Sequence, residues 1–331
     1  MKFWKFFIVT LSVLLLALAL CSCSGEEELL TEAVYYTVKF DSSGGSNIDS
    51  VEVISGGTLK APEDPVRDGY IFDGWVDNTG DSWSFGVHNV KEDMTLYAKW
   101  IEASTVFDYL TLDGKDGAVI SKLKSVYSKN IKVPSVINGL TVTGIGEGVF
   151  ADRPFDEIEK ITLPETVSTI AQGAFANCVG IEITVIGELT EVGEKAFLNC
   201  DGLSSVKLGE GLKEVGIQAF CGCVNLKDVR LPSSLEKIGE NAFEDCTSLV
   251  YVVMHDTTKL SNSSFIGCDS LVTVYYYGTD ESFTQMFASE SDKYGNESIT
   301  EARLYFYSEQ QPDSDGDFWY MDEKGKIKLW K

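Results

Sequence analysis

Apolar residues recur along the middle of the chain with a period of 22–25 residues. After each of several cysteines, apolar residues stand at +3, +6 and +8, as in Leu226, Val229 and Leu231. The last two alternate as a short strand does, with one side inward and one outward. The phenylalanines that carry the period are Phe150, Phe175, Phe197, Phe220, Phe243 and Phe265, and the cysteines that follow are Cys178, Cys200, Cys223, Cys246 and Cys268. A repeat of this length, locked in phase, predicts a solenoid.

Each repeat contains an Ile-Gly-x-x-Ala-Phe or closely related stretch that we expect to turn the coil. Gly193, Gly216 and Gly239 stand at its equivalent positions, and glycine suits a tight bend or a positive φ. One copy alone cannot bury its apolar face, so stacked copies must share one core, with strands about 4.8 Å apart. Around Cys178 the +6 position is Thr184, which predicts a local shift of register. Arg153 replaces the cysteine in the first copy, as expected where a repeat meets a cap.

The Leu-Pro-x-x-Leu-x-x-Ile-Gly-x-x-Ala-Phe-x-x-Cys-x-x-Leu pattern covers residues 140–278. It resembles the BspA-type leucine-rich repeats of bacterial surface proteins. The resemblance implies a cell-surface protein that adheres to host proteins or to other bacteria.

Residues 34–101 follow a different pattern, in which glycine pairs bound short alternating runs such as Tyr36–Phe40 and Val51–Ile54. This pattern predicts hairpins. The Gly-Tyr-x-Phe-x-Gly-Trp string that ends at Trp75, and the Thr-Leu-Tyr-Ala-Lys-Trp string that ends at Trp100, resemble the Listeria–Bacteroides repeat. That resemblance implies a small β-grasp-like domain.

The tryptophans of this segment invite two interpretations. Trp75 and Trp100 lie within strand patterns, so core packing is favoured over stacking on sugars. Trp83 and Phe85 lie in a looser stretch and are better candidates for exposure.

The expected fold class is therefore mainly β, a leucine-rich repeat solenoid of about six copies preceded by a small β-grasp-like domain. Residues 102–139 are expected to cap the first copy. Residues 279–331 are expected to cap the last copy with a helix from Asp280, a strand at Arg303–Tyr307 and a final hairpin.

Residues 1–22 join a basic start to an apolar run, the pattern of an export signal. The Leu-Cys-Ser before Cys23 resembles a lipobox, which implies that Cys23 is lipid-modified and that the protein is anchored to a membrane at the bacterial cell surface. A plain secretory signal is the alternative. Residues 23–33 are acidic and are expected to form a solvated tether, although they also resemble an export tag for the outer surface.

The chain has a formal charge of −24, and without residues 1–22 it keeps 25 basic and 51 acidic residues, a net of −26. This charge argues against nucleic acid and anionic membranes as partners. It favours a basic host protein or a cation-bridged surface, unless it only keeps an exposed protein soluble.

The sequence predicts no enzyme, no cofactor and no metal. It has only two histidines, His88 and His255, which serve triads and zinc ligation poorly. The pair Cys221 and Cys223 could bind metal or cycle in redox chemistry, but a column of buried, mostly reduced thiols is favoured. The aspartates from Asp313 to Asp317 suggest calcium, yet Lys324 stands where an EF-hand loop needs its last glutamate, so a polar turn is favoured.

The outward strand positions are polar in early copies and become aromatic or β-branched in the last two copies. Such clusters mark interaction sites, although the C-terminal cap could instead fold over them. The predicted partner-binding residues are Tyr251, Val253, His255, Thr273, Tyr275 and Tyr277. The expected partner is an extracellular protein of the host matrix or another bacterium. The alternative is a surface glycan captured by exposed aromatic side chains.

Overall fold

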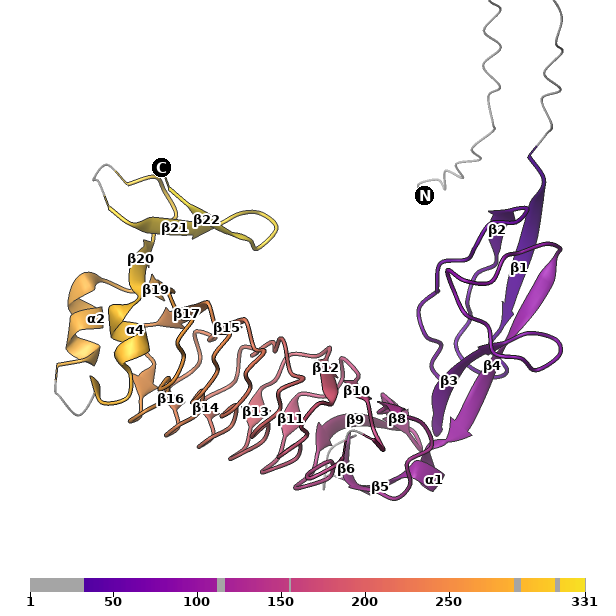
Figure 1. Cartoon of the computed structure of the whole chain (residues 1–331), viewed down its shortest axis with the longest axis horizontal. Coiled ribbons are helices and arrows are strands. Elements are labelled where there is room, and N and C mark those ends of the chain that lie inside the picture. Colours follow the sequence, from indigo (N-terminus) through magenta and orange to yellow (C-terminus); the bar gives the residue numbers. More distant parts are fainter. Residues whose placement is uncertain (1–32, 112–116, 155, 289–292, 313–315, 331) are drawn as a thin grey trace, which may run out of the picture.

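The computed structural model describes residues 33–111, 117–154, 156–288, 293–312 and 316–330. The predicted export signal, Cys21, Cys23, Asp313 and Asp315 lie outside the described residues. A long coil of short strands forms the middle of the molecule (Figure 1). A small sheet domain at one end and a β-hairpin at the other rise from the same side of this coil, so the molecule encloses an open gap.

The N-terminal domain is one sheet of four strands in the order β2-β1-β4-β3. The strands are β1 (Tyr35–Asp41), β2 (Val51–Ile54), β3 (Tyr70–Val76) and β4 (Met94–Glu102). The central pair β1 and β4 is parallel, and both outer pairs are antiparallel. The crossover from β2 to β3, which the structure describes throughout, contains no helix.

Aromatic side chains fill the core of this domain. Trp75 is 3% exposed and packs edge-on against the ring of Phe72. Trp100 is half-buried, and its indole N–H donates to the carbonyl of Ser42 at 2.9 Å. Trp83 and Phe85, the better candidates for exposure, are half-buried against this core, as Trp100 is.

The rest of the described chain contains three short helices and three sheets. One sheet, the flank sheet, contains β5 (Phe107–Thr111), β6 (Gly117–Leu123), β8 (Val136–Ile137), β9 (Leu140–Ile145), β11 (Thr169–Ile170), β13 (Glu191–Val192), β14 (Glu214–Val215), β16 (Lys237–Ile238) and β18 (Lys259–Leu260). The strands that face the gap, the inner strands, are β7 (Asn130–Lys132), β10 (Lys160–Leu163), β12 (Glu182–Val185), β15 (Asp228–Arg230), β17 (Tyr251–His255) and β19 (Thr273–Tyr277). Pairing along both edges of the coil is parallel, one copy to the next.

The phenylalanine column lies between these sheets. Its six rings are fully buried, and neighbouring rings stack with centroids 5.0–5.4 Å apart and planes within 11° of parallel. The spacing of the rings is close to that of the strands, because both are set by the rise from one copy to the next. The repeated phenylalanine therefore builds one continuous core.

The cysteine column satisfies buried backbone groups beside the rings. Each Sγ lies 3.0–3.3 Å from the carbonyl oxygen of the phenylalanine one copy before its own, to which its thiol donates. Burial raises the pKa of the Cys200 and Cys223 thiols, so they stay protonated and unreactive. The described cysteines are all free thiols.

The predicted register shift around Cys178 is confirmed. In β12 the buried side chains are Ile183 and Val185, and Thr184 faces the gap. Counted from the cysteine of its own copy, β12 begins one residue earlier than β15 and β17 do. The next copy forms no strand at residues 203–206, and only Leu208 makes an isolated bridge, to Leu189. The inner strands are therefore divided into a sheet that ends at β12 and another that begins at β15.

Glycine stands at the equivalent positions for a different reason from the tight bend or positive φ that was expected. Gly193, Gly216 and Gly239 do not have positive φ. A Cβ on Gly216 would lie 2.5 Å from the backbone of Gly193, one copy earlier. The positive φ falls two residues later, as at Gln218 (53°) and Asn241 (58°). Close approach of successive backbones selects glycine here.

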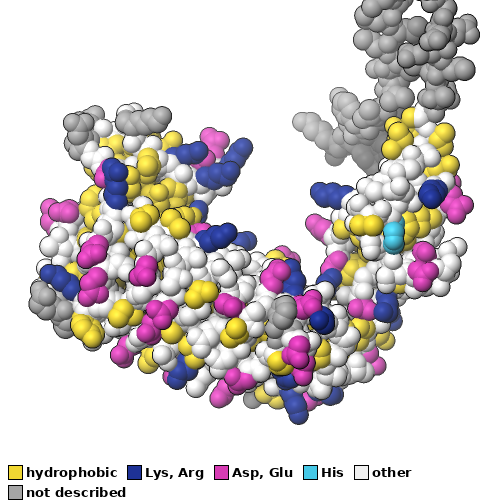
Figure 2. All heavy atoms as spheres, in the orientation of Figure 1, with side chains coloured by type: hydrophobic (Ala, Val, Ile, Leu, Met, Phe, Trp, Pro, Cys, Tyr) yellow, Lys and Arg dark blue, Asp and Glu magenta, His cyan; other side chains and the backbone are white. Residues whose placement is uncertain are grey.

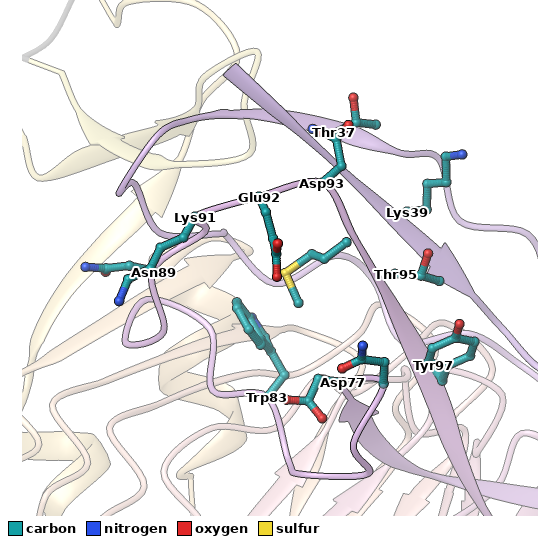
Figure 3. A pocket seen from close by; sticks show the side chains of 12 residues that line it. Thr37, Lys39, Asp77, Trp83, Asn89, Lys91, Glu92, Asp93, Thr95 and Tyr97 are labelled. Carbon is teal, nitrogen blue, oxygen red and sulfur yellow. Dashed lines mark hydrogen bonds between the residues drawn. The ribbon is translucent and has the colours of Figure 1, made fainter. Parts of the chain in front are cut away.

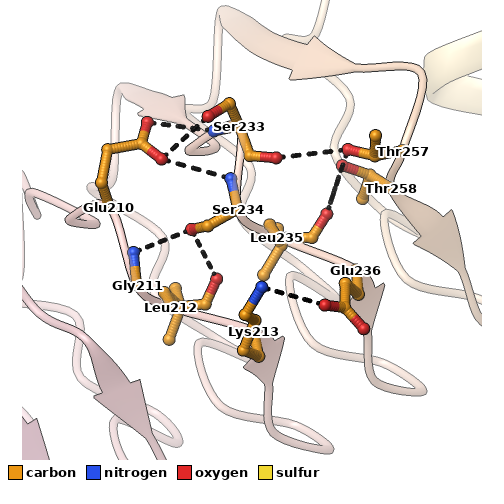
Figure 4. Close-up of polar contacts among 10 residues, drawn as sticks. All are labelled: Glu210, Gly211, Leu212, Lys213, Ser233, Ser234, Leu235, Glu236, Thr257 and Thr258. Carbon is orange, nitrogen blue, oxygen red and sulfur yellow. Dashed lines mark hydrogen bonds and ion pairs between the residues drawn. The ribbon is translucent and has the colours of Figure 1, made fainter.

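Polar side chains tie the turns of neighbouring copies together, as Figure 4 shows for Glu210. Its carboxylate accepts from the backbone N–H of Ser233 at 3.1 Å and of Ser234 at 3.2 Å, and from the Ser233 hydroxyl at 2.9 Å. The backbone N–H of Ser233 is the main reason that the pKa of Glu210 lies below its ordinary value. These bonds fix the edge of the inner face.

The segments that flank the coil continue its sheets. The short helix α1 (Ala103–Val106) leads into the hairpin β5–β6, which takes the end place in the flank sheet. After β19, the chain forms α2 (Asp280–Met286) and α4 (Glu297–Glu301). It then adds β20 (Arg303–Tyr307), β21 (Phe318–Met321) and β22 (Ile327–Leu329) to the inner strands. The expected helix from Asp280, the strand and the hairpin are therefore all present, whereas α4 was not predicted.

Asn296 supplies the hydrogen-bond acceptor that the last copy would otherwise receive from a following copy. In earlier copies the backbone N–H of the phenylalanine donates to the next copy, as from Phe243 to the carbonyl of Ser264 at 2.8 Å. Phe265 has no next copy, and its N–H donates to the Asn296 side-chain oxygen at 3.3 Å. The Asn296 amide donates in turn to the carbonyl of Ser261 at 3.0 Å, and the residue is fully buried. A side chain thus replaces the backbone of a further copy.

Replacing Phe220 with alanine should destabilise the coil by about 3–5 kcal/mol, because the fully buried ring is lost and a cavity remains. Urea unfolding followed by circular dichroism measures this change. The exposed Ser205→Ala in the neighbouring copy serves as the control. A loss below about 1 kcal/mol for Phe220→Ala would show that the column is not the main core.

Gly216→Ala and Gln218→Gly, two residues apart, should behave differently. The first should lower stability by more than about 1 kcal/mol, since the added Cβ meets fixed backbone of the preceding copy. The second should be nearly neutral, because relief of a left-handed non-glycine residue offsets the entropy of a flexible glycine. Equal losses in thermal melts would contradict the close-approach explanation.

Candidate binding surface

The outward side of the inner strands, here called the inner face, borders the gap between the two ends of the molecule. At one end, Lys132 of β7 pairs with Asp64 of the N-terminal domain at 2.6 Å. At the other end, the Arg230 guanidinium of β15 donates to the carbonyl of Gly325, in the β21–β22 turn, at 3.1 Å. These contacts place both ends beside the inner face.

The strand register aligns the outward residues into a central column along the inner face. Lys207 belongs to it by its spacing of 23 residues from Arg230. The column consists of Lys132, Thr162, Thr184, Lys207, Arg230, Val253, Tyr275 and Tyr305. It changes along the coil from polar and basic to aromatic.

Five of the six predicted partner-binding residues are half-buried on this face. The rings of Tyr251 and Tyr275 meet edge-on with centroids 5.5 Å apart. His255 and Tyr277 stack in parallel at 4.4 Å. Burial raises the pKa of each of these three tyrosines and lowers that of His255, so these side chains are uncharged near neutral pH. The remaining residue of the five, Thr273, lies in register with Tyr251.

Val253 is the exception, because it is only 3% exposed. It stands in register with Tyr275, whose ring packs against Trp319 at 5.4 Å. The prediction that Val253 is an exposed contact residue was wrong.

Trp319 of β21 covers part of the aromatic cluster and is fully buried. Its ring lies 4.7 Å from that of Tyr277 and 5.1 Å from that of Tyr307. The C-terminal hairpin thus folds over the end of the inner face, as the alternative interpretation expected, while leaving the tyrosines half-exposed. The sequence analysis missed Tyr305, Tyr307 and Trp319, although the outward aromatic alternation of β20 continues that of β19.

The N-terminal domain has a polar pocket of 610 Å³ (Figure 3). Trp83 and Asp77 line it from one side, and Lys91, Glu92 and Thr95 are among the other lining residues. The buried indole N–H of Trp83 has no hydrogen-bond partner within the part of the chain that the structure describes.

A second hollow, of 560 Å³, lies where the N-terminal domain meets the coil. Tyr70, Phe72 and Trp100 contribute from the domain, and Pro134 and Pro164 from the coil. The Arg67 guanidinium lies over the Tyr70 ring at 3.8 Å. This hollow continues the inner face toward the N-terminal domain.

Within the described residues, no group of three or more metal-binding side chains comes together. Asp317, from the stretch that suggested calcium, instead forms two bonds of 2.7 and 2.9 Å with Arg303. Burial and the nearby Glu244 raise the pKa of Cys221 to about 12, which does not favour a metal or redox pair with Cys223. None of the described helices has the length and apolar character that crossing a membrane requires.

Two family models match the chain. The BspA-type leucine-rich repeat region matches residues 143–272 in six copies, and the Listeria-Bacteroides repeat domain matches residues 36–99. A putative membrane protein of Evansella cellulosilytica is 35% identical over 30% of this chain and 15% of its own length. Internalin H of Listeria monocytogenes is 34% identical over 35% of this chain and 20% of its own length. The chain therefore corresponds to only a small part of these relatives.

Solved structures of similar chains include a leucine-rich repeat protein of T. pallidum, with 30% identity over 52% of this chain and 84% of that one, at a TM-score of 0.45. A leucine-rich repeat protein of Bacteroides ovatus has 29% identity over 51% of this chain and 45% of that one, also at 0.45. Together with the coil described above, the matching family models identify the two parts. The chain carries a BspA-type leucine-rich repeat region preceded by a Listeria–Bacteroides repeat domain.

Proposed function

We propose that this protein is a lipid-anchored binding protein of the bacterial cell surface, which holds an extracellular protein on its inner face. The observation that carries the proposal is the half-buried aromatic cluster around Tyr251, Tyr275 and Tyr277, beside the gap. Tyrosines that combine apolar area with a polar hydroxyl are enriched at protein interfaces. Repeats of this kind form extended concave surfaces that bind other proteins.

The anchor in this proposal is Cys23, and the acidic residues 24–33 are the tether. In this proposal the N-terminal domain would stand between the membrane anchor and the repeats, and would hold the inner face away from the membrane. Leucine-rich repeats without a catalytic cluster serve as scaffolds, so the proposed role needs no chemistry beyond binding.

Carbohydrate capture is the second candidate function. The pocket around Trp83 favours it, because this pocket combines a partly exposed indole with several polar side chains. Under this proposal a glycan would bind the N-terminal domain and raise its melting temperature.

Cys23→Ser should move the full-length protein, expressed in a bacterium that processes lipoproteins, from the membrane fraction to the soluble fraction. The reason is that acyl chains anchor a protein through the area they bury in the bilayer. Detergent phase separation with labelled fatty acid measures the change, and Cys21→Ser is the control. If the Cys23→Ser protein still carries the fatty-acid label and stays in the membrane fraction, Cys23 is not the anchor.

Tyr251→Ala should weaken binding of a protein ligand by about tenfold or more, as expected for a central aromatic contact. The ligand would come from a panel of immobilised extracellular matrix proteins and glycans, screened by biolayer interferometry. The control is Tyr294→Ala, because Tyr294 is 65% exposed and lies outside the inner strands. Unchanged binding with a lowered melting temperature would assign Tyr251 to the fold. Glycan binding that Trp83→Ala abolishes would instead support carbohydrate capture.

A further inference from the structure

The inner face has a charge opposite to that of the whole molecule. The chain has a formal charge of −24. Yet the outward positions of the inner strands contain three cations, Lys132, Lys160 and Arg230, and two carboxylates, Glu182 and Asp228. Outside these strands, Lys207 stands one copy before Arg230, and Lys227 directly precedes β15 as Glu159 precedes β10. The central column itself contains no acidic residue.

Three of these cations have no carboxylate partner, although the Arg230 guanidinium also donates to the carbonyl of Gly325. Lys132 pairs with Asp64 at 2.6 Å, and Lys160 pairs with Glu182 at 2.6 Å. Lys207, Lys227 and Arg230 are exposed and form no ion pair with any described residue. Their positions in the repeat make them neighbours, because Lys227 and Arg230 lie in one copy and Lys207 lies in the copy before, 23 residues from Arg230.

The turn of the C-terminal hairpin brings two lysines, Lys324 and Lys326, and two carboxylates, Asp322 and Glu323, to the same place. The two lysines stand on either side of Gly325, whose carbonyl accepts from Arg230. The Asp322 carboxylate in this turn accepts from the backbone N–H groups of Lys324 and Lys326 at 2.9 and 2.8 Å. In Figure 2, Lys and Arg side chains lie on the hairpin and on the surface below it, next to apolar side chains.

Local charge, and not the total, decides which partner binds here. At physiological ionic strength the Debye length is about 8 Å, so exposed acidic residues on distant sides of the coil are screened from this face. The nearby Glu210 carboxylate already accepts hydrogen bonds from Ser233 and Ser234. The expectation of a basic partner followed from the summed charge, which does not describe the inner face.

The aromatic geometry favours a protein over a sugar. Stacking on a sugar needs an open ring face, whereas Tyr251 and Tyr275 cross at 80°. One face of Tyr277 lies on His255, and its ring also meets Trp319 at 73°. Tyr275 also meets Tyr305 and Trp319, and Tyr277 also meets Tyr307, so other rings lie against both and leave less open face for a sugar than an isolated tyrosine has.

We propose that the inner face binds an acidic segment of a partner protein, with carboxylates at Lys207, Lys227 and Arg230 and apolar side chains at the adjacent tyrosines. This rests on the proposed function and adds the chemical class of the partner. Complementary charge of this kind increases the association rate and fixes the position of the partner.

The test uses poly-L-glutamate as the acidic probe, with poly-L-glutamine as the neutral probe and heparin as an anionic polysaccharide. The full chain should bind poly-L-glutamate, and binding should weaken as salt rises from 20 to about 500 mM. Lys207→Gln with Lys227→Gln should lower the affinity about tenfold. Both side chains are exposed and have no described ion pair, so folding should be unaffected. Lys122→Gln with Lys259→Gln is the matched control, with the same charge change on the flank sheet.

Loss of binding in both double variants to the same extent would overturn the inference, as would equal binding of the two polypeptides. Heparin binding without poly-L-glutamate binding would also overturn it, in favour of an anionic glycan. The proposed function is tested separately by its own protein ligand. A ligand that depends on Tyr251 but not on Lys207 and Lys227 would refute the acidic partner and leave the binding role intact.

Discussion

Stacking of one copy on the next is the constraint on which the rest of this structure depends. The phenylalanine of each copy stacks on the ring of the neighbouring copy, 5.0–5.4 Å away, within one apolar core that all copies share. The same rise brings successive backbones so close at Gly216 that no side chain fits. It also lets each cysteine thiol donate to the carbonyl of the phenylalanine one copy before its own, as from Cys223 to Phe197. The packing of the core, the choice of glycine in the turns and the hydrogen bonds of the buried polar groups therefore all depend on the rise from one copy to the next.

Because each copy needs a neighbour, the first and last copies must be completed by other segments. The outward side of the inner strands, in contrast, is free of this constraint. At the last copy, the backbone N–H of Phe265 would be unpaired without Asn296. At the inner face, the outward side chains do not contribute to the core, so the chain can vary them. They change from lysines and threonines to tyrosines without altering the coil, which is how a rigid scaffold accommodates a binding surface.

The C-terminal hairpin gives this surface its shape. By placing Trp319 against Tyr275 and Tyr277, it buries one part of the aromatic cluster and restricts access to the rest. By contact with Arg230 it brings Lys324 and Lys326, with the carboxylates of Asp322 and Glu323, to the basic part of the face. A partner would therefore meet charges and partly covered tyrosines together, which supports a protein ligand in preference to a sugar stacked on an open ring.

The sequence by itself determined the repeat, its length, its buried columns and the shifted copy at Thr184, because periodic burial leaves a periodic pattern. It also predicted the strands of the N-terminal domain and the final hairpin from local alternation. It could not determine that Val253 is covered, that Trp319 lies over the tyrosines or that Asn296 completes the last copy. Nor could the summed charge reveal a basic inner face. These features depend on contacts between residues far apart in the chain, which local patterns do not record and only the tertiary structure decides.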